Sequence, residues 1–286
     1  MKLVRYGAKG KEKPGIIDDE GKLRDISKLV KDITPELLSP AALSDLAKKV
    51  KARMAKLPKV SGKPRMGVPL AGIPNIICIG LNYADHAAEA GQPVPTNPIV
   101  FFKHSSSLTG PNDPVPVPRE SKHMDWECEL GVVIGRTARY VKKQDALRYV
   151  AGYTIVNDVS ERNYQMHKGG GQWSKGKSSP GFAPIGPWLV TRDEVKDPQK
   201  LGMTLDVNGR RFQNGSTATM IFDVATLVSD LSSYMTLLPG DVISTGTPPG
   251  VGSGVKPEPI FLKVGDTMEL AIDGLGTQKQ KCVATK

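Results

Sequence analysis

Two glutamates in the segment MDWECELGVVIG have the spacing needed to share a cation. Side chains alternate between the faces of a strand, so Glu127 and Glu129 lie on one face. The opposite face then carries Trp126, Cys128 and Leu130. Such a pair usually marks the wet face of a half-buried strand. Here the run continues into VVIG, which is typical of a strand buried on both faces, and carboxylates entering a core are costly unless paired. A bound cation would satisfy both.

A third carboxylate, Asp158, ends the apolar strand in YVAGYTIVNDVSERNYQ. If a helix follows directly, Arg162 and Gln165 come four and seven positions later and share a face with Asp158. Three carboxylates without a His or Cys set favour a hard cation, Mg²⁺ or Mn²⁺, over zinc. The sequence therefore predicts a metal site formed by Glu127, Glu129 and Asp158.

A histidine and a glutamate in GLNYADHAAEAGQPVP are candidates for general-base chemistry. His86 and Glu89 are three positions apart, one helical turn, so their side chains can touch. A carboxylate that accepts one imidazole N–H fixes the tautomer and leaves the other nitrogen as a base near neutral pH. The alternative is a surface histidine beside a surface glutamate. Glycines and prolines bracket residues 80–95, which predicts a loop able to close over a substrate.

The segment GQWSKGKS at residues 171–178 matches the phosphate-loop pattern GxxxxGK[ST]. A phosphate loop needs a strand before it and a helix after it, whereas the flanks here are the polar RNYQMHKGG and the helix-hostile SSPGFAPIGP. We therefore reject a nucleotide site. Lys177 remains a candidate partner for a substrate carboxylate or a developing enolate, with a plain exposed lysine as the alternative. The Gly/Pro loop in GDVISTGTPPGVGSG, which contains Thr247, could approach a ligand closely or be a tight connection.

These groups need a scaffold, and the chain predicts a mostly β one with a few helices outside it. Short apolar or alternating runs recur from NIICIG at residues 75–80 to TMELAID, separated by turn residues. Helical patterns are few: residues 41–57, KKQDALRYV, VSERNYQMHK and VATLVSDLSSYM. A linker rich in Pro, Gly and Lys at 57–74 divides a small N-terminal α+β domain, residues 1–70, from a main domain, residues 71–286.

The net charge of +10 is concentrated near the N-terminus. Residues 1–63 carry 16 Lys/Arg and 8 Asp/Glu, which leaves 23 basic and 21 acidic residues for the rest. The basic residues are not interleaved with aromatics, so we expect no nucleic-acid partner. No run approaches the roughly 18 apolar residues of a membrane span, and the N-terminus lacks an export signal. The three cysteines form no CxxC pair, so we expect a cytoplasmic protein without membrane insertion.

Taken in order, NYADHAAE, DWECELGVVIG, NDVSERNYQ, KGKS and ISTGTPPGVG resemble the fumarylacetoacetate hydrolase superfamily from about residue 72 to the C-terminus. The N-terminal residues resemble a bacterial branch often named ureidoglycolate lyase, and within it the hydrolases of 2,4-diketo-3-deoxy-L-fuconate and L-rhamnonate. The resemblance implies a mixed β-sandwich roll, usually dimeric, so we expect a homodimer.

The resemblance also assigns roles to residues. It implies Mg²⁺ or Mn²⁺ on Glu127, Glu129 and Asp158, and water activation by His86 and Glu89 beneath a closing lid. We predict Lys177 as a catalytic residue. The positions predicted to bind substrate are Tyr83, Arg162, Gln165 and Thr247.

Together with these residues, the resemblance implies metal-dependent hydrolysis of a C–C bond in a 2,4-diketo acid. The substrate would be an acylpyruvate or a diketo-deoxy sugar acid, and the products pyruvate and a second carboxylic acid. Decarboxylation or tautomerisation of a β-keto acid such as oxaloacetate, or a ureidoglycolate lyase reaction, could use the same site. A non-catalytic binder of dicarboxylates or sugar acids and a basic interaction protein are rivals from other classes. The His86–Glu89 pair argues against the binder, and the nearly neutral main domain against the interaction protein.

Overall fold

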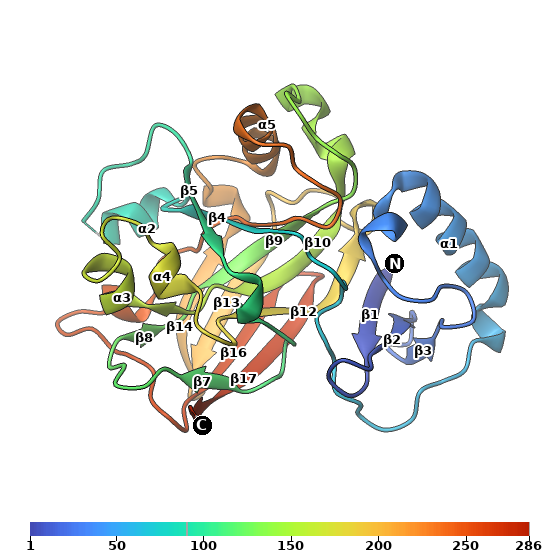
Figure 1. The fold of residues 1–286 in the computed structure, drawn as a ribbon, viewed down its shortest axis with the longest axis horizontal. Helices are drawn as coiled ribbons and strands as arrows, with labels where there is room; N and C mark the ends of the chain where they lie inside the picture. The colour runs from blue at the N-terminus through green and yellow to red at the C-terminus, as the bar shows by residue number, and fades with distance from the viewer. Residues whose placement is uncertain (90, 286) are drawn as a thin grey trace.

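The largest sheet of the computed structural model runs across the molecule, from the N-terminal strands β1–β3 on one side to β4 and β5 on the other (Figure 1). Within residues 1–89 and 91–285, which the structure describes, its order is β3-β2-β1-β12-β10-β9-β15-β4-β5, with β6 paired to β12. Its strands span β1 Lys2–Tyr6, β2 Lys13–Ile17, β3 Leu23–Asp25, β4 Ile76–Gly80, β5 Ile99–Lys103, β6 Leu108–Thr109, β9 Cys128–Ile134, β10 Val150–Asn157, β12 Ala183–Thr191 and β15 Val242–Ser244.

A second sheet, ordered β14-β13-β16-β17-β7, packs against the first, and a short pair, β11 with β8, lies beside the site. These strands are β7 Val115–Val117, β8 Met124–Asp125, β11 Ser160–Glu161, β13 Gly202–Val207, β14 Arg210–Ser216, β16 Thr267–Ile272 and β17 Gly276–Ala284. Buried and less buried residues alternate along β13 and β16, so one face of this sheet meets the core.

The helices are short apart from two. They are α1 Pro40–Arg53, α2 Ala84–Glu89, α3 Arg162–Met166, α4 Ser174–Lys177 and α5 Val224–Tyr234. The 3-10 segments are η1 Pro35–Leu38, η2 Met54–Lys56, η3 Ser105–Ser107, η4 Lys143–Tyr149, η5 Arg192–Glu194, η6 Thr217–Thr219 and η7 Gly252–Gly254. The helix α5 is capped by Asp223, whose carboxylate accepts the Thr226 N–H at 2.7 Å. It buries an apolar stripe at helical spacing: Val224, Leu227, Val228 and Leu231.

The central strands β9 and β10 are buried along their whole length because a hydrophobic core lies on each face. One core contains side chains of β9 and β10 with those of β13 and β16. The other lies between the sheet and the N-terminal segment and includes Leu46 and Val50 of α1. Polar residues at the ends of these two strands are therefore attached to strands that are packed in hydrophobic cores on both faces.

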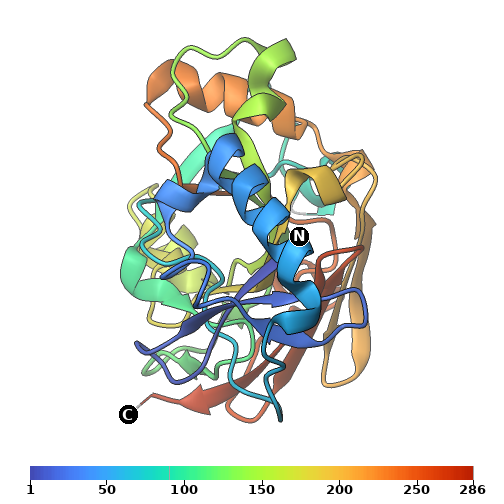
Figure 2. The same cartoon turned by 90° about the vertical axis from the view of Figure 1, so that its right-hand side faces the viewer.

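Residues 1–70 extend the main sheet, since β1 pairs with β12 in the register Lys2↔Val190 and Leu3↔Leu189. Figure 2 views the molecule from the side of this segment, with α1 in front. The fork of Arg65 binds Asp113 of the main part at 2.7 and 2.6 Å and also reaches Glu12 at 2.8 Å. The division of the chain at residue 70 stays a prediction, and Lys286 at its end lies outside the described residues.

The predicted mostly β fold with a few outer helices is confirmed. Two local expectations differ. KKQDALRYV forms the 3-10 segment η4 instead of an α-helix. The helix expected directly after Asp158 begins only at Arg162, because Ser160–Glu161 first pair with β8. Among the described residues, no helix combines the length and apolar character required to cross a bilayer.

Candidate active site

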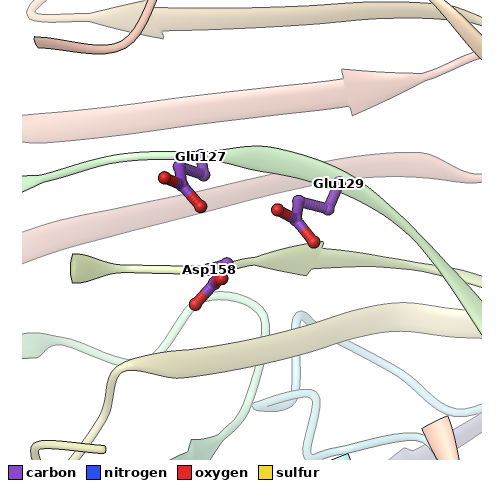
Figure 3. Close-up of side chains that lie close together, drawn as sticks. All are labelled: Glu127, Glu129 and Asp158. Carbon is purple, nitrogen blue, oxygen red and sulfur yellow. The ribbon is translucent and has the colours of Figure 1, made fainter. Parts of the chain in front are cut away.

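Three carboxylates meet where β9 begins and β10 ends (Figure 3). The antiparallel register pairs Glu129 with Val156 and Cys128 with Asn157, and the Asp158 N–H donates to the Glu127 carbonyl at 2.9 Å. One oxygen from each of Glu127, Glu129 and Asp158 lies within 4.8 Å of the others. All three side chains are buried. Neighbouring strands thus bring together residues that the sequence separates by about thirty positions.

Buried donors bind one oxygen of each carboxylate in this cluster. Ser244 Oγ and the Gly246 N–H donate to Glu129 Oε2 at 2.5 and 3.0 Å. Lys177 Nζ lies between two carboxylates, 2.7 Å from Glu127 Oε2 and 2.8 Å from Asp158 Oδ2. Its side chain is only 2% exposed, so the alternative of a plain surface lysine is excluded. The helix α4 that carries it follows a turn instead of a strand, which agrees with the rejection of a phosphate loop.

Burial and neighbouring charges shift the pKa values of the two glutamates in opposite directions. Burial and the neighbouring charges of Asp158 and Glu127 raise the pKa of Glu129 well above its usual range. Burial also acts to raise the pKa of Glu127, but Lys177 and Arg162 outweigh it and lower that pKa to about 2. Burial opposes the charge on Lys177, yet Asp158 and Glu127 raise its pKa above the ordinary value. Lys177 therefore stays charged and neutralises only part of the carboxylate cluster.

The predicted His86–Glu89 pair forms on α2. His86 Nδ1 lies 3.0 Å from Glu89 Oε2, and the Gly250 N–H donates to Glu89 Oε1 at 2.9 Å. A carboxylate only accepts, so Nδ1 carries the proton and Nε2 is left as the acceptor. Gly254 makes room for this arrangement, because a Cβ there would lie 2.4 Å from the Glu89 carboxyl carbon.

Arg162 and Gln165 of α3 complete the polar part of the site. Arg162 Nη1 donates to Gln165 Oε1 at 3.0 Å, and Nη2 lies 2.8 Å from Glu127 Oε1. Arg162 reaches the carboxylate cluster through Glu127, not through the shared helix face with Asp158 that the sequence suggested. Its Nε donates to the buried Asp125 at 2.8 Å.

Of the other two residues predicted to bind substrate, Thr247 lies at the cavity and Tyr83 does not. Thr247 lines the cavity, but its hydroxyl already donates to the Cys128 carbonyl at 3.0 Å and accepts from Gln213 at 2.7 Å. Tyr83 is fully buried in the core, and its hydroxyl donates to the sulfur of Met203 at 3.2 Å. The structure therefore does not bring Tyr83 to the cavity. The backbone of Tyr83 forms an isolated antiparallel bridge with Met220, and its ring belongs to the hydrophobic core.

A cavity of about 280 Å³ connects these groups. Its polar end holds Glu127, Glu129, Lys177, Arg162, Gln165 and the His86–Glu89 pair, with Asp158 directly behind Lys177. Its other walls are mostly apolar, with Ile79, Leu81, Phe101, Met166, Trp173 and Val251, and they also include the polar residues Gln92, Thr247 and Ser253. The Trp173 ring packs so closely on Gly80 that a Cβ there would lie 2.3 Å from it. The predicted closing loop, residues 80–95, includes Ala90, which lies outside the described residues.

Residues 75–283 match the sequence model of the fumarylacetoacetate (FAA) hydrolase C-terminal domain. The chain belongs to the fumarylacetoacetate hydrolase family. A 2,4-didehydro-3-deoxy-L-rhamnonate hydrolase of Sphingomonas sp. strain SKA58 is 57% identical over 281 residues, covering 98% of this chain and 95% of the relative. This family and fold were expected from the sequence motifs, and the comparison confirms both.

Two solved structures of the superfamily share the fold over the full length of both chains. The fumarylacetoacetate hydrolase of psychrophilic Exiguobacterium antarcticum has a TM-score of 0.86 at 35% identity. The maleylpyruvate hydrolase of Sphingobium sp. SYK-6, solved with manganese(II) and pyruvate, has a TM-score of 0.83 at 28% identity. The present chain is thus an enzyme of the same superfamily.

The donor set of this family member fits a hard divalent cation. Three buried carboxylates present oxygens within one small volume, and no sulfur or imidazole joins them among the described residues. Burial and the crowding of like charge together raise the pKa of Glu129, and a bound cation would offset both. The residues that would hold it are Glu127, Glu129 and Asp158.

Sequence reasoning missed three buried polar residues of the site: Lys103, Asp125 and Ser244. Lys103 ends the apolar run PIVFFK, and a lysine there is a weak sign of a buried ion pair. Asp125 directly precedes the WECELG part of the motif and reads as an ordinary turn residue. Their partners lie far away in the chain, so spacing alone could not reveal them.

Proposed function

We propose that this protein hydrolyses the C3–C4 bond of a 2,4-diketo acid, releasing pyruvate and a second carboxylic acid. The observation that carries the proposal is that one cavity is lined by two of the three clustered carboxylates, Glu127 and Glu129, and by the His86–Glu89 pair. Asp158 lies directly behind Lys177. The rhamnonate-type hydrolase relative acts, by its name, on a diketo-deoxy sugar acid, which supports this substrate class. The pyruvate bound to the maleylpyruvate hydrolase supports the product.

The proposed cation is Mg²⁺ or Mn²⁺, held by Glu127, Glu129 and Asp158. When bound, it would supply Lewis acidity where negative charge develops on the substrate's keto oxygens. Lys177 and Arg162 point their charged groups at the same end of the cavity and would bind the substrate carboxylate. Gln165 holds the Arg162 guanidinium in place by accepting from Nη1.

His86 supplies the base in this proposal. Because Glu89 accepts the Nδ1 proton, Nε2 can take a proton from a water molecule as that water attacks the C4 carbonyl. Collapse of the tetrahedral intermediate breaks the C3–C4 bond. C4 leaves as the carboxylic acid, and the bonding electrons pass to the pyruvate enolate. The proton that His86 took from water then passes to C3 of the enolate, which gives pyruvate.

The apolar walls indicate which acyl group the cavity accepts. Beyond the polar end, the substrate tail would meet the Phe101 and Trp173 rings, whose centroids are 5.5 Å apart. The cations that line the cavity within residues 1–89 and 91–285 lie at its polar end: Arg162, Lys177 and, when protonated, His86. A short, uncharged tail fits such a wall. Lys177 Nζ lies 5.1 Å from the Phe101 ring centroid, and past it a second carboxylate would meet no further cation among the described lining residues. An acylpyruvate or a deoxy sugar acid is therefore favoured over a dicarboxylate.

The test is a panel of acylpyruvates, diketo-deoxy sugar acids and dicarboxylate analogues, assayed for pyruvate release with Mg²⁺ and with Mn²⁺. Hydrolysis places solvent ¹⁸O in the carboxylic acid released from C4, whereas a decarboxylase or tautomerase does not. Pyruvate release without ¹⁸O incorporation would overturn the proposal.

We also propose that the enzyme acts as a homodimer in the cytoplasm. The unpaired, buried cysteines Cys78, Cys128 and Cys282 support a reducing compartment. Light scattering coupled to size-exclusion chromatography tests the dimer, and a single monomer peak at micromolar concentration would contradict it.

A further inference from the structure

Asp125 is a fully buried carboxylate beside the site to which neither the family resemblance nor the proposed chemistry assigns a role. Both of its oxygens are engaged. Oδ1 accepts the N–H groups of Trp126 at 2.8 Å and Gly252 at 2.7 Å. Oδ2 accepts the Ser253 N–H at 3.0 Å and Arg162 Nε at 2.8 Å.

These contacts join two parts of the site that are far apart in the sequence. On one side, the guanidinium of Arg162 continues to Glu127 Oε1 at 2.8 Å. On the other side, Gly252 and Ser253 belong to the loop whose Gly250 N–H donates to Glu89 Oε1 at 2.9 Å. Glu89 in turn fixes His86. A connected path therefore runs from Glu127 to the base: the ion pair with Arg162, the hydrogen bonds of Asp125, the backbone of residues 250–253 and the hydrogen bonds of Glu89.

We propose that Asp125 is a positioning residue that orients the His86–Glu89 pair relative to the metal-site carboxylates. Resting on the function proposed above, this inference adds a residue that touches no substrate. The loop 250–254 holds Glu89 only while Asp125 fixes its backbone. Groups that orient catalytic or ligating side chains typically change affinity or activity by roughly 10- to 100-fold when removed.

The first variant is Asp125→Asn, which keeps the shape but replaces one acceptor oxygen by an N–H₂ group. We expect kcat to fall roughly 10- to 100-fold. KM should rise as well, because Arg162 loses a partner. A matched control is Asp241→Asn. Asp241 is equally buried and accepts Leu238 N–H at 2.7 Å and Asn75 Nδ2 at 2.8 Å, but it has no contact with Arg162 or the loop 250–254.

A double-mutant cycle with Glu89→Gln separates positioning from general loss of structure. If Asp125 acts through Glu89, the kcat loss caused by Asp125→Asn should shrink to within about 3-fold once Glu89 is already replaced, whereas independent effects multiply. The rise in KM acts through Arg162 and should persist in both backgrounds. The same kcat loss in both backgrounds would overturn the proposal.

Gly254→Ala tests the same connection without touching Asp125, in case Asp125→Asn does not fold. A Cβ at Gly254 would lie 2.4 Å from the Glu89 carboxyl carbon, so it should displace that carboxylate and reproduce the coupled loss of kcat. Full retention of kcat in Gly254→Ala would contradict the proposal.

A measurement without turnover distinguishes failure of this inference from failure of the proposed function. The chain has four histidines, so the imidazole ¹H–¹⁵N spectrum of the metal-free protein can be assigned by single substitutions. We expect the Nδ1–H signal of His86 to shift or broaden in Asp125→Asn and to stay unchanged in Asp241→Asn. An unchanged His86 signal in Asp125→Asn would overturn the positioning role, whether or not the protein releases pyruvate.

Discussion

Lys103 Nζ lies 2.5 Å from Asp158 Oδ1, and the opposite oxygen of the same carboxylate accepts from Lys177 at 2.8 Å. Lys103 is only 3% exposed and also donates to the Val159 carbonyl at 3.0 Å. Two buried ammonium groups therefore hold Asp158 from two sides. The two lysines differ in position, because Lys177 lines the cavity and Lys103 does not.

Replacing Lys103 by methionine removes the ammonium but keeps much of the side-chain volume. Removing one partner of a buried ion pair typically costs about 3–5 kcal/mol. Because Asp158 keeps Lys177 as its second partner, the free energy of unfolding should fall by about 3 kcal/mol or less. Urea denaturation at pH 7 measures the change. The control is Lys279→Met, whose ion pair with Glu269 is exposed and should contribute much less. Equal losses in the two variants would contradict a structural role for Lys103.

Replacing Glu129 by glutamine should abolish binding of Mn²⁺ to the metal-free protein. The amide removes one of three anionic ligands and adds an N–H₂ group that cannot coordinate a cation. Isothermal titration calorimetry with Mn²⁺ and Mg²⁺ is the measurement. Glu269→Gln, an exposed glutamate outside the site, is the control and should bind like the unmodified protein. Retained Mn²⁺ affinity in Glu129→Gln would disprove the assignment of the metal site.

Replacing His86 by alanine should lower kcat by roughly 10²- to 10⁴-fold, the usual contribution of a general base. Binding of Mn²⁺ should persist, because His86 is not one of the three carboxylate ligands. Pyruvate release and calorimetry measure the two effects separately. His104→Ala serves as the control, since His104 is exposed and lies outside the cavity lining. A variant at His86 that turns over normally would remove this residue from the mechanism.

The sequence predicted which residues come together at the site better than the long-range contacts that hold them there. Glu127 and Glu129 could be placed on one face because strand periodicity is local, and His86 and Glu89 because one helical turn separates them. Lys103 meets Asp158 across 55 positions, and Ser244 meets Glu129 across 115. Such pairs depend on strand order and register, which local patterns do not encode. Tyr83 is the converse case, because it lies inside a matching motif and yet its side chain is fully buried in the core.

The same limit applied to the fold. Alternation and apolar runs predicted strands at β9 and β10, since those runs are buried on both faces. The pairing of β1 with β12, which joins the N-terminal strands to the main sheet, links distant parts of the chain and had no local pattern. The helix expected after Asp158 was delayed because Ser160–Glu161 found a strand partner in β8.

Replacing Trp173 by alanine should change which acyl tails are accepted. The ring packs against Phe101 and Gly80 in the apolar wall, so its loss enlarges the tail end of the cavity. We expect kcat/KM to fall for a short acylpyruvate. The ratio of kcat/KM for a longer, branched acylpyruvate to that for the short one should rise roughly 10-fold for each additional buried methylene. Trp188→Ala, outside the cavity lining, is the control. An unchanged ratio between the two substrates would contradict the placement of the tail.

The Arg65–Asp113 contact should make stability depend on pH in the acid range. Burial acts to raise the pKa of Asp113, but Arg65, the Gly110 N–H and Thr109 outweigh it, so its pKa in the folded protein is lowered. A lowered folded pKa means that the unfolded chain binds the proton first. The stabilisation is therefore complete above about pH 4, the unfolded value, and is lost as the pH falls through the folded pKa. Urea denaturation of the unmodified protein and of Asp113→Asn from pH 7 to pH 3 should show a gap that closes towards low pH. A gap that stays constant, or that widens on acidification, would show that Asp113 does not stabilise the fold as an anion.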